Sequence, residues 1–137
     1  MDRRAISSLL LALMMFAGAS APATAQTSTP AAWQATPASV LKSALRSTTA
    51  AQERYFVSHR IYAASAQQLG LALEPGVRVT ILGAGTAGWQ AKATWDGRRG
   101  ASCVVFVGTV GDSEAPRTDG DREMAGEEGV PLCDRMR

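Results

Sequence analysis

The stretch VTILGAGTAGWQAKATWDG, residues 79–97, joins a β-branched run to three glycines and then to an alternating segment. Gly83, Gly85 and Gly88 have the G-x-G-x-x-G spacing of a dinucleotide-binding fingerprint. That fingerprint needs a helix that begins near the third glycine, because the N-terminal amides of the helix hold the pyrophosphate. In residues 89–95, however, apolar and polar side chains alternate with a period of two, which predicts a strand.

The segment that follows the glycines is also too short to form a crossover helix. Asp96-Gly97 interrupts the chain directly after it, and parallel strands need a crossover of a dozen or more residues. The stretch therefore predicts two antiparallel strands joined by a flexible glycine-rich connection, in which glycine permits positive φ. A dinucleotide-binding enzyme is the least favoured of the functions that we consider, and no cofactor is expected.

Two neighbouring segments extend the predicted sheet. Residues 77–82 (VRVTIL) alternate between apolar and polar, whereas residues 102–108 (SCVVFVG) are apolar on both faces, as in a central strand. The Asp96-Gly97 pair marks the hairpin between the second and third strands. Beyond residue 108 the chain resembles an acidic loop until the closing GVPLCDRMR returns Cys133 to the sheet.

A long amphipathic helix is predicted before the sheet, from Pro37 to about His59. Thr36 can cap its N-terminus, and proline is well tolerated at the first helical position. One apolar stripe recurs at three- and four-residue steps, and a sheet must cover it. The stripe consists of Leu41, Ala44, Leu45, Thr48, Ala51, Tyr55 and Phe56. A capping box at Ser65 and Gln68 predicts one further short turn that ends at Gly70.

The first 25 residues have the layout of a secretory signal peptide. Arg3 and Arg4 precede a short apolar stretch, and small residues lead to a cleavage site before Gln26. A permanent membrane span is the weaker interpretation, because the apolar stretch is short and contains serines. We therefore expect an exported protein, periplasmic or extracellular.

The exported part divides into a lead-in and one domain. Residues 26–38 are rich in Thr, Pro and Ala and predict a flexible lead-in. Trp33 stands alone in this segment and is a candidate to pack back onto the domain. Residues 39–137 form the predicted globular domain.

Charge is balanced overall but is unevenly distributed. The formal net charge of +2 argues against a nucleic-acid partner. Seven of the acidic residues lie in residues 111–129, which we interpret as a solvated loop. Calcium binding is the alternative, although Met124 occupies the position where the calcium-loop pattern requires glycine. The carboxylates that could attract calcium are Asp119, Asp121, Glu123, Glu127 and Glu128.

Few residues in the chain are suited to catalysis. Cys103 and Cys133 are the only cysteines, and in an oxidising compartment they are interpreted as one disulfide rather than as a catalytic or metal-binding pair. His59 is the only histidine, and its predicted place at a helix end suits a capping role. Tyr55, Phe56 and Tyr62 are expected to be core residues and not a stacking platform. We predict no catalytic and no metal-binding residues.

The order of these elements resembles the globular head of bacterial type IV pilins and pseudopilins. The resemblance spans about Val40 to Cys133, and it is most specific in AAQERYFVSHRIYAAS (residues 50–65), in GWQAKATW (residues 88–95) and in the closing GVPLC. It implies an α+β fold in which the long N-terminal helix packs on a small antiparallel sheet of three or four strands. It also implies that a Cys103–Cys133 disulfide closes the C-terminal loop.

The segment before the predicted head departs from the pilin pattern. Pilins have a distinctive leader, a glutamate at the fifth mature position and a long apolar assembly helix, whereas residues 26–38 are polar and contain proline. We expect an exported, non-enzymatic, pilin-like protein that acts through its surface, as a pilus or type II secretion accessory or as a binding module. A true minor pilin with an altered or misassigned start is the alternative. The sequence does not indicate an oligomeric state.

Overall fold

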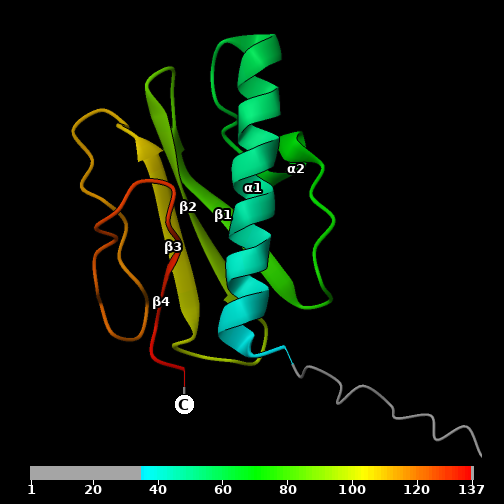
Figure 1. Cartoon of the computed structure of the whole chain (residues 1–137), viewed down its shortest axis with the longest axis vertical. Helices are drawn as coiled ribbons and strands as arrows, with labels where there is room; N and C mark the ends of the chain where they lie inside the picture. The colour runs from blue at the N-terminus through cyan, green and yellow to red at the C-terminus, as the bar shows by residue number, and fades with distance from the viewer. Residues whose placement is uncertain (1–34, 137) are drawn as a thin grey trace, which may run out of the picture. The chain divides into compact units, whose positions relative to one another are not determined.

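The computed structural model describes residues 35–136, which form a helix packed on an antiparallel sheet (Figure 1). The elements are α1 (Pro37–His59), α2 (Ala66–Leu69), β1 (Val77–Ala84), β2 (Gly88–Trp95), β3 (Ser102–Gly108) and β4 (Leu132–Cys133). The strand order is β1-β2-β3-β4, and every neighbouring pair is antiparallel. The predicted α+β class, long helix and small sheet are confirmed. The predicted signal peptide and residues 26–34 lie outside the described residues.

Helix α1 begins as its sequence predicts. Thr36 is the N-cap, and its hydroxyl accepts a hydrogen bond from the Ser39 amide at 3.2 Å. At the other end, the Arg60 amide donates to the Phe56 carbonyl at 2.8 Å, and Arg60 adopts the left-handed conformation with φ of 59°. Glycine is usual at this kind of helix end, so the side chain of Arg60 carries a conformational cost.

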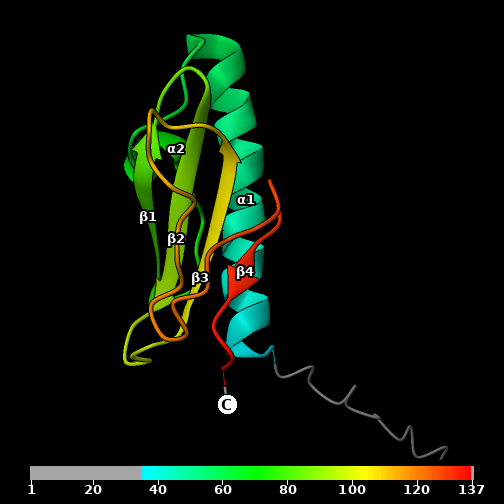
Figure 2. The ribbon, with the colours of Figure 1, turned by 90° about the vertical axis from the view of Figure 1, so that its left-hand side faces the viewer.

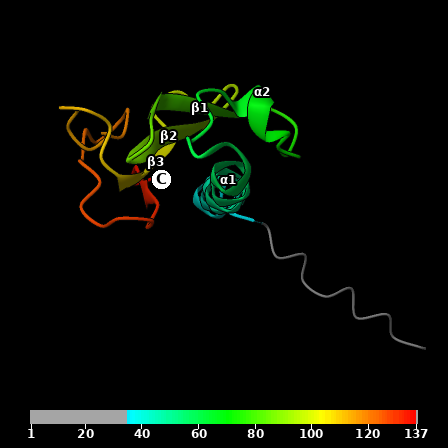
Figure 3. The same cartoon turned by 90° about the horizontal axis from the view of Figure 1, so that it is seen from above.

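The main core lies between α1 and one face of the sheet (Figure 3). The alternation in β1 and β2 places Val77, Val79, Trp89, Ala91 and Ala93 on this face. The α1 residues that are buried are Leu41, Ala44, Leu45, Thr48, Ala51 and Gln52. The helix stripe is thus confirmed over its first four turns.

The prediction that the aromatic residues at the end of the stripe belong to the core is wrong. Tyr55 and Phe56 are half-exposed. Tyr55 stacks on His59 with ring centroids 3.9 Å apart, and Phe56 stacks on Tyr62 at 4.5 Å. Only Tyr62 of the three packs against the main core, and it is itself partly exposed. The helix extends beyond the sheet there, so its last turn has no strand to bury it (Figure 1).

Gln52 occupies the buried position where the aromatic residues were expected. It is fully buried, and its side-chain amide pairs with the backbone of Ala63 in both directions. Its Nε2 donates to the Ala63 carbonyl at 2.9 Å, and its Oε1 accepts from the Ala63 amide at 2.7 Å. This pair fixes the chain that leaves α1, because it satisfies both polar groups of a buried peptide.

The glycine-rich connection joins two antiparallel strands, as predicted. The Gly85 amide donates to the Gly88 carbonyl at 2.9 Å and closes the turn. The expected reason for the glycines is wrong, because Gly83, Gly85 and Gly88 do not have positive φ. Space explains two of them: a Cβ on Gly88 would lie 2.3 Å from the Val107 carbonyl oxygen, and one on Gly83 would lie 2.9 Å from Val110.

Candidate functional surface

The second face of the sheet is covered by residues 109–131, which we call the strap (Figure 2). The alternation in β2 places Gln90 on this face, where it is only 8% exposed. Its Nε2 donates to the Glu114 carbonyl of the strap at 2.9 Å. Two positions further along β2, the Lys92 ammonium pairs with the Asp119 carboxylate. The strap therefore contacts the polar side chains of β2.

The strap folds back on itself at its centre. Arg117 and Met124 form an isolated β-bridge, and the Thr118 amide donates to the Glu123 carbonyl at 2.9 Å. Thr118 is fully buried, and Ala125 is only 3% exposed. The acidic side chains of this segment are mostly exposed, as expected, but the centre of the strap is ordered around buried residues and is not a fully solvated loop. A hairpin with its own buried residues lies on the sheet.

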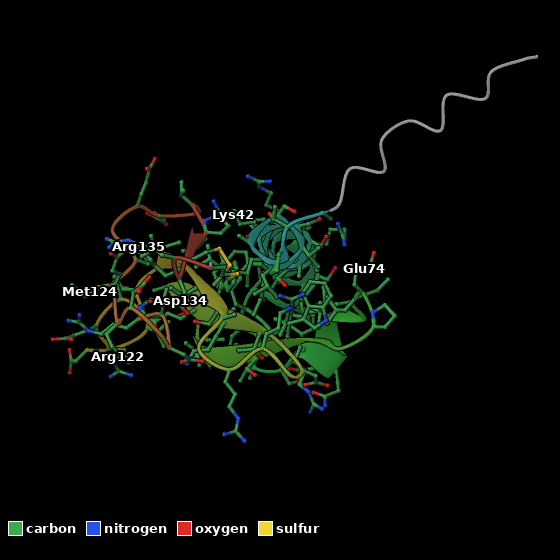
Figure 4. The ribbon with its side chains drawn as sticks, turned by 90° about the horizontal axis from the view of Figure 1, so that it is seen from below. Lys42, Glu74, Arg122, Met124, Asp134 and Arg135 are labelled. Carbon is green, nitrogen blue, oxygen red and sulfur yellow. A yellow bond between two sulfur atoms is a disulfide. The ribbon has the colours of Figure 1, made fainter. Side chains whose placement is uncertain are left out.

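Asp134 holds this hairpin to the strands. Its carboxylate accepts hydrogen bonds from the Ser102 amide at 2.8 Å and from the Ser102 hydroxyl at 2.9 Å. It also accepts from the amides of Gly120 at 3.1 Å and Asp121 at 2.7 Å. One buried carboxylate thus ties the start of β3 to the turn of the strap, and Figure 4 shows Asp134 between the two.

The environment of Asp134 favours its ionised form. Burial acts to raise the pKa of its carboxyl group. The hydrogen bonds that it accepts, first among them the one from the Asp121 amide, outweigh burial and lower the pKa to about 2. No sequence motif predicts this role. The only signal was the position of an aspartate directly after the second cysteine.

The predicted disulfide is confirmed. Cys103 in β3 and Cys133 in β4 are bonded, and they are also register partners in the sheet. The next residue pair reinforces this link, because the Asp134 amide donates to the Ser102 carbonyl at 2.9 Å. The C-terminal end of the strap is therefore held by a covalent bond and by the Asp134 carboxylate, side by side.

Four of the five candidate calcium ligands pair with donor groups of the protein. Besides the pairing of Asp119 with Lys92, Asp121 accepts from the Arg135 amide at 2.6 Å, and Glu123 pairs with the Arg135 guanidinium at 2.7 Å. Glu128 accepts from the Gly108 amide at 2.6 Å. Residues 35–136 contain no group of three or more side chains placed to hold a metal ion. Calcium binding stays the untested alternative, and the described residues hold no preformed site for it.

The other residues considered for chemistry are the glycines, which border the start of the strap at Val110, and His59 at the end of α1. The dinucleotide-type glycines stand between two antiparallel strands and not between a strand and a helix. His59 lies at the exposed end of α1, as predicted, and its Nδ1 lies 2.9 Å from the Tyr55 carbonyl. These residues belong to separate turns of the chain.

The outer side of the strap is the candidate functional surface. It exposes two large apolar side chains, Met124 at 45% and Val130 at 46%. The acidic side chains of Asp112, Glu114 and Glu127 are also exposed. Figure 4 shows Met124 at the outer margin of the strap, away from α1. A rigidly held surface with apolar and acidic groups can bind another macromolecule.

No protein-family model and no curated protein matches this chain. Among the helices of residues 35–136, none is both long and apolar enough to cross a lipid bilayer.

Proposed function

We propose that this chain is an exported, non-enzymatic, pilin-like protein that acts through its surface. It serves as an accessory of a pilus or secretion apparatus, or as a binding module. The observation that carries this proposal is the clamped strap: a long segment without repetitive structure is held on the sheet by the Cys103–Cys133 disulfide and by Asp134. The order of helix, antiparallel sheet and disulfide-closed end supports the pilin-like class.

Two features support export and surface action. A disulfide between strands of a small domain suits an oxidising compartment. The strap contributes little to the main core, yet its position is fixed by charge-assisted hydrogen bonds to Asp134 and Lys92. Fixing a loop in this way prepares it for recognition, because the entropy of ordering it is lost on folding and not on binding.

Export is tested by fractionating the native host and measuring the intact mass of the protein. We expect a chain that begins at Gln26 in the periplasmic or extracellular fraction, with no free thiol at Cys103 or Cys133. A protein that retains residues 1–25 in the inner membrane would contradict export in soluble form.

Surface action is tested with strap variants that leave the fold intact. Asp112→Lys combined with Glu127→Lys reverses two exposed charges, and Glu53→Lys is the matched control on the exposed side of α1. In a host that lacks the native gene, we expect the strap variant to lose pilus or secretion activity while the control restores it. Equal activity of both folded variants would contradict action through the strap.

The minor-pilin alternative makes a different prediction. If the start of the chain is misassigned, the DNA upstream of Met1 encodes in frame a pilin leader and an apolar helix. The protein would then be found in filaments sheared from the cell surface. Its absence from sheared filaments, together with a mature start at Gln26, favours the accessory or binding role.

A further inference from the structure

A groove runs along α1 on the side away from the strap. Its volume is about 550 Å³, and it lies between α1 and residues 71–77. The buried part of its lining is apolar and includes Ala44 and Val77, with Val40 and Leu73 partly buried beside them. Exposed serines and Glu74 border it, and Figure 4 shows Glu74 on the opposite side of the molecule from Asp134 and Arg135.

The groove exists because α1 has short side chains along one line. Ser39, Ser43 and Ser47 are four residues apart and therefore share one side of the helix. None of them is long enough to reach across to the neighbouring segment. The result is an open groove with an apolar floor and a polar border. One aromatic side chain can enter it.

The described part of the chain begins at this groove. Ala35, the first described residue, is part of the lining. Trp33 precedes it by two residues, so its Cα lies within about 7 Å of the Cα of Ala35. Trp33 is also the only large apolar side chain in residues 26–36. The length of the connection therefore allows an indole at residue 33 to reach the edge of the apolar floor.

We propose that Trp33 docks in the groove between α1 and residues 71–77. The indole ring contacts Val40 and Leu73, while its N–H finds a hydrogen-bond acceptor in Glu74 or in a bordering serine. Tryptophan suits such a site, because it combines a large apolar body with one polar edge that needs a partner. The chain then covers its own apolar groove. This inference does not depend on the proposed function.

A second cavity near the start of α1 is the alternative destination for Trp33. It has a volume of about 640 Å³, and its lining includes Arg98, Arg99 and Arg135. An indole can stack on a guanidinium, but entering this cavity would remove water from several charged groups. The apolar floor beside Val40 has no such cost, so the groove is the favoured site.

The experiment uses the chain expressed from its full sequence and purified after export, with 5-fluorotryptophan in place of its three tryptophans. Fluorine NMR then gives one resonance for each tryptophan, and Trp33→Phe assigns the resonance of residue 33. A soluble paramagnetic agent broadens exposed resonances. We expect the Trp33 resonance to be protected, since burial of so large an apolar side chain favours the docked form by about tenfold or more.

A groove-filling variant makes the test specific. Ser43→Phe adds an aromatic ring at an exposed position of the lining, so folding is expected to survive. Ser58→Phe makes the same change at an exposed position of α1 outside the groove. We expect Ser43→Phe to expose the Trp33 resonance and Ser58→Phe to leave it protected.

Four results would overturn the proposal. The Trp33 resonance could broaden in the unmodified chain as freely as an exposed tryptophan does. It could stay protected in Ser43→Phe but become exposed in an Arg98→Ala/Arg99→Ala variant, which would place it in the second cavity. Protection that disappears on dilution would assign the groove to a second copy of the chain. Protection that requires added phospholipid vesicles would assign Trp33 to a membrane surface.

Discussion

The two faces of the sheet are covered by different means. On one face, α1 buries apolar side chains of β1 and β2, and Gln52 is the exception that reaches from the helix to a backbone peptide. On the other face, the strap lies on Gln90 and Lys92 and is held by Asp134. The first face is mainly apolar, whereas the second combines buried apolar residues such as Val104 with hydrogen bonds and an ion pair.

The difference follows from how each covering segment satisfies its backbone. A helix pairs its own amides and carbonyls, so α1 needs only an apolar stripe to pack. A strap without repetitive structure must find partners for its backbone elsewhere. The amides of Gly120 and Asp121 find them in the Asp134 carboxylate. Buried polar groups therefore gather on the strap side, and that side is the more sensitive to single polar substitutions.

Removing the disulfide should affect the strap face most strongly. For Cys103→Ala/Cys133→Ala we expect a loss of about 3–4 kcal/mol in the free energy of unfolding, since the bond closes a long loop. Hydrogen exchange should accelerate first at strap amides such as those of Thr118 and Ala125, while α1 amides stay protected. Denaturant unfolding and exchange measure both quantities. A uniform loss of protection over both faces would show that the two faces are not independent.

Substituting Asp134 separates the polar clamp from the covalent one. Asp134→Asn places an amide NH₂ among backbone donors, and we expect it to cost about 2–3 kcal/mol of stability. Asp112→Asn, at an exposed position of the strap, is the control and should cost almost nothing. Thermal unfolding at neutral pH compares the two variants. Equal stabilities would mean that water replaces the bonds of Asp134.

The same residue predicts an acid dependence of the native chain. The pKa of Asp134 is lowered to about 2 in the folded state, below its ordinary value of 3.8. Its contribution of about 2 kcal/mol is therefore complete above pH 4 and is lost as the pH falls through 2. In Asp134→Asn this part of the pH profile should be absent. If the stability of Asp134→Asn falls between pH 4 and pH 2 as that of the native chain does, the acid dependence comes from other carboxylates.

Gln52 is the corresponding test on the α1 face. Gln52→Leu keeps the apolar character of that face but leaves the buried amide and carbonyl of Ala63 without partners. We expect a loss of about 2 kcal/mol. Gln67→Leu, at an exposed position in α2, is the matched control. If Gln52→Leu is as stable as the native chain, the face tolerates a purely apolar packing.

The smallest expected effects are gains in stability. Arg60 ends α1 and Arg122 turns the strap, and both have φ of 59°. Arg60→Gly and Arg122→Gly should each stabilise the protein by about 0.5–1 kcal/mol, because glycine adopts this conformation without strain. The Arg60 change should slow exchange in α1 and the Arg122 change in the strap. A loss of stability in either variant would show that the arginine side chain makes a needed contact.

Local patterns in the sequence were sufficient for most of the fold. Thr36 and Pro37 predicted the start of α1, alternation predicted two of the strands, and a continuous apolar run predicted a third. They were insufficient for the candidate surface, because Asp134 acts on amides that lie 13 and 14 residues away in the chain. Gln52 was missed for a related reason: it follows Thr48 at helical spacing, but its partner at Ala63 lies beyond the end of the helix.

The sequence by itself determined the helix, the strands and the two cysteines available for pairing. These depend on near neighbours, through capping, the period of apolar residues and the chemistry of the thiol. Only the tertiary structure decided how the strap covers the sheet, why Gly83 and Gly88 have no side chain, and which groups satisfy Asp134. These depend on atoms far apart in the chain, where no local pattern records the distance or the direction of approach.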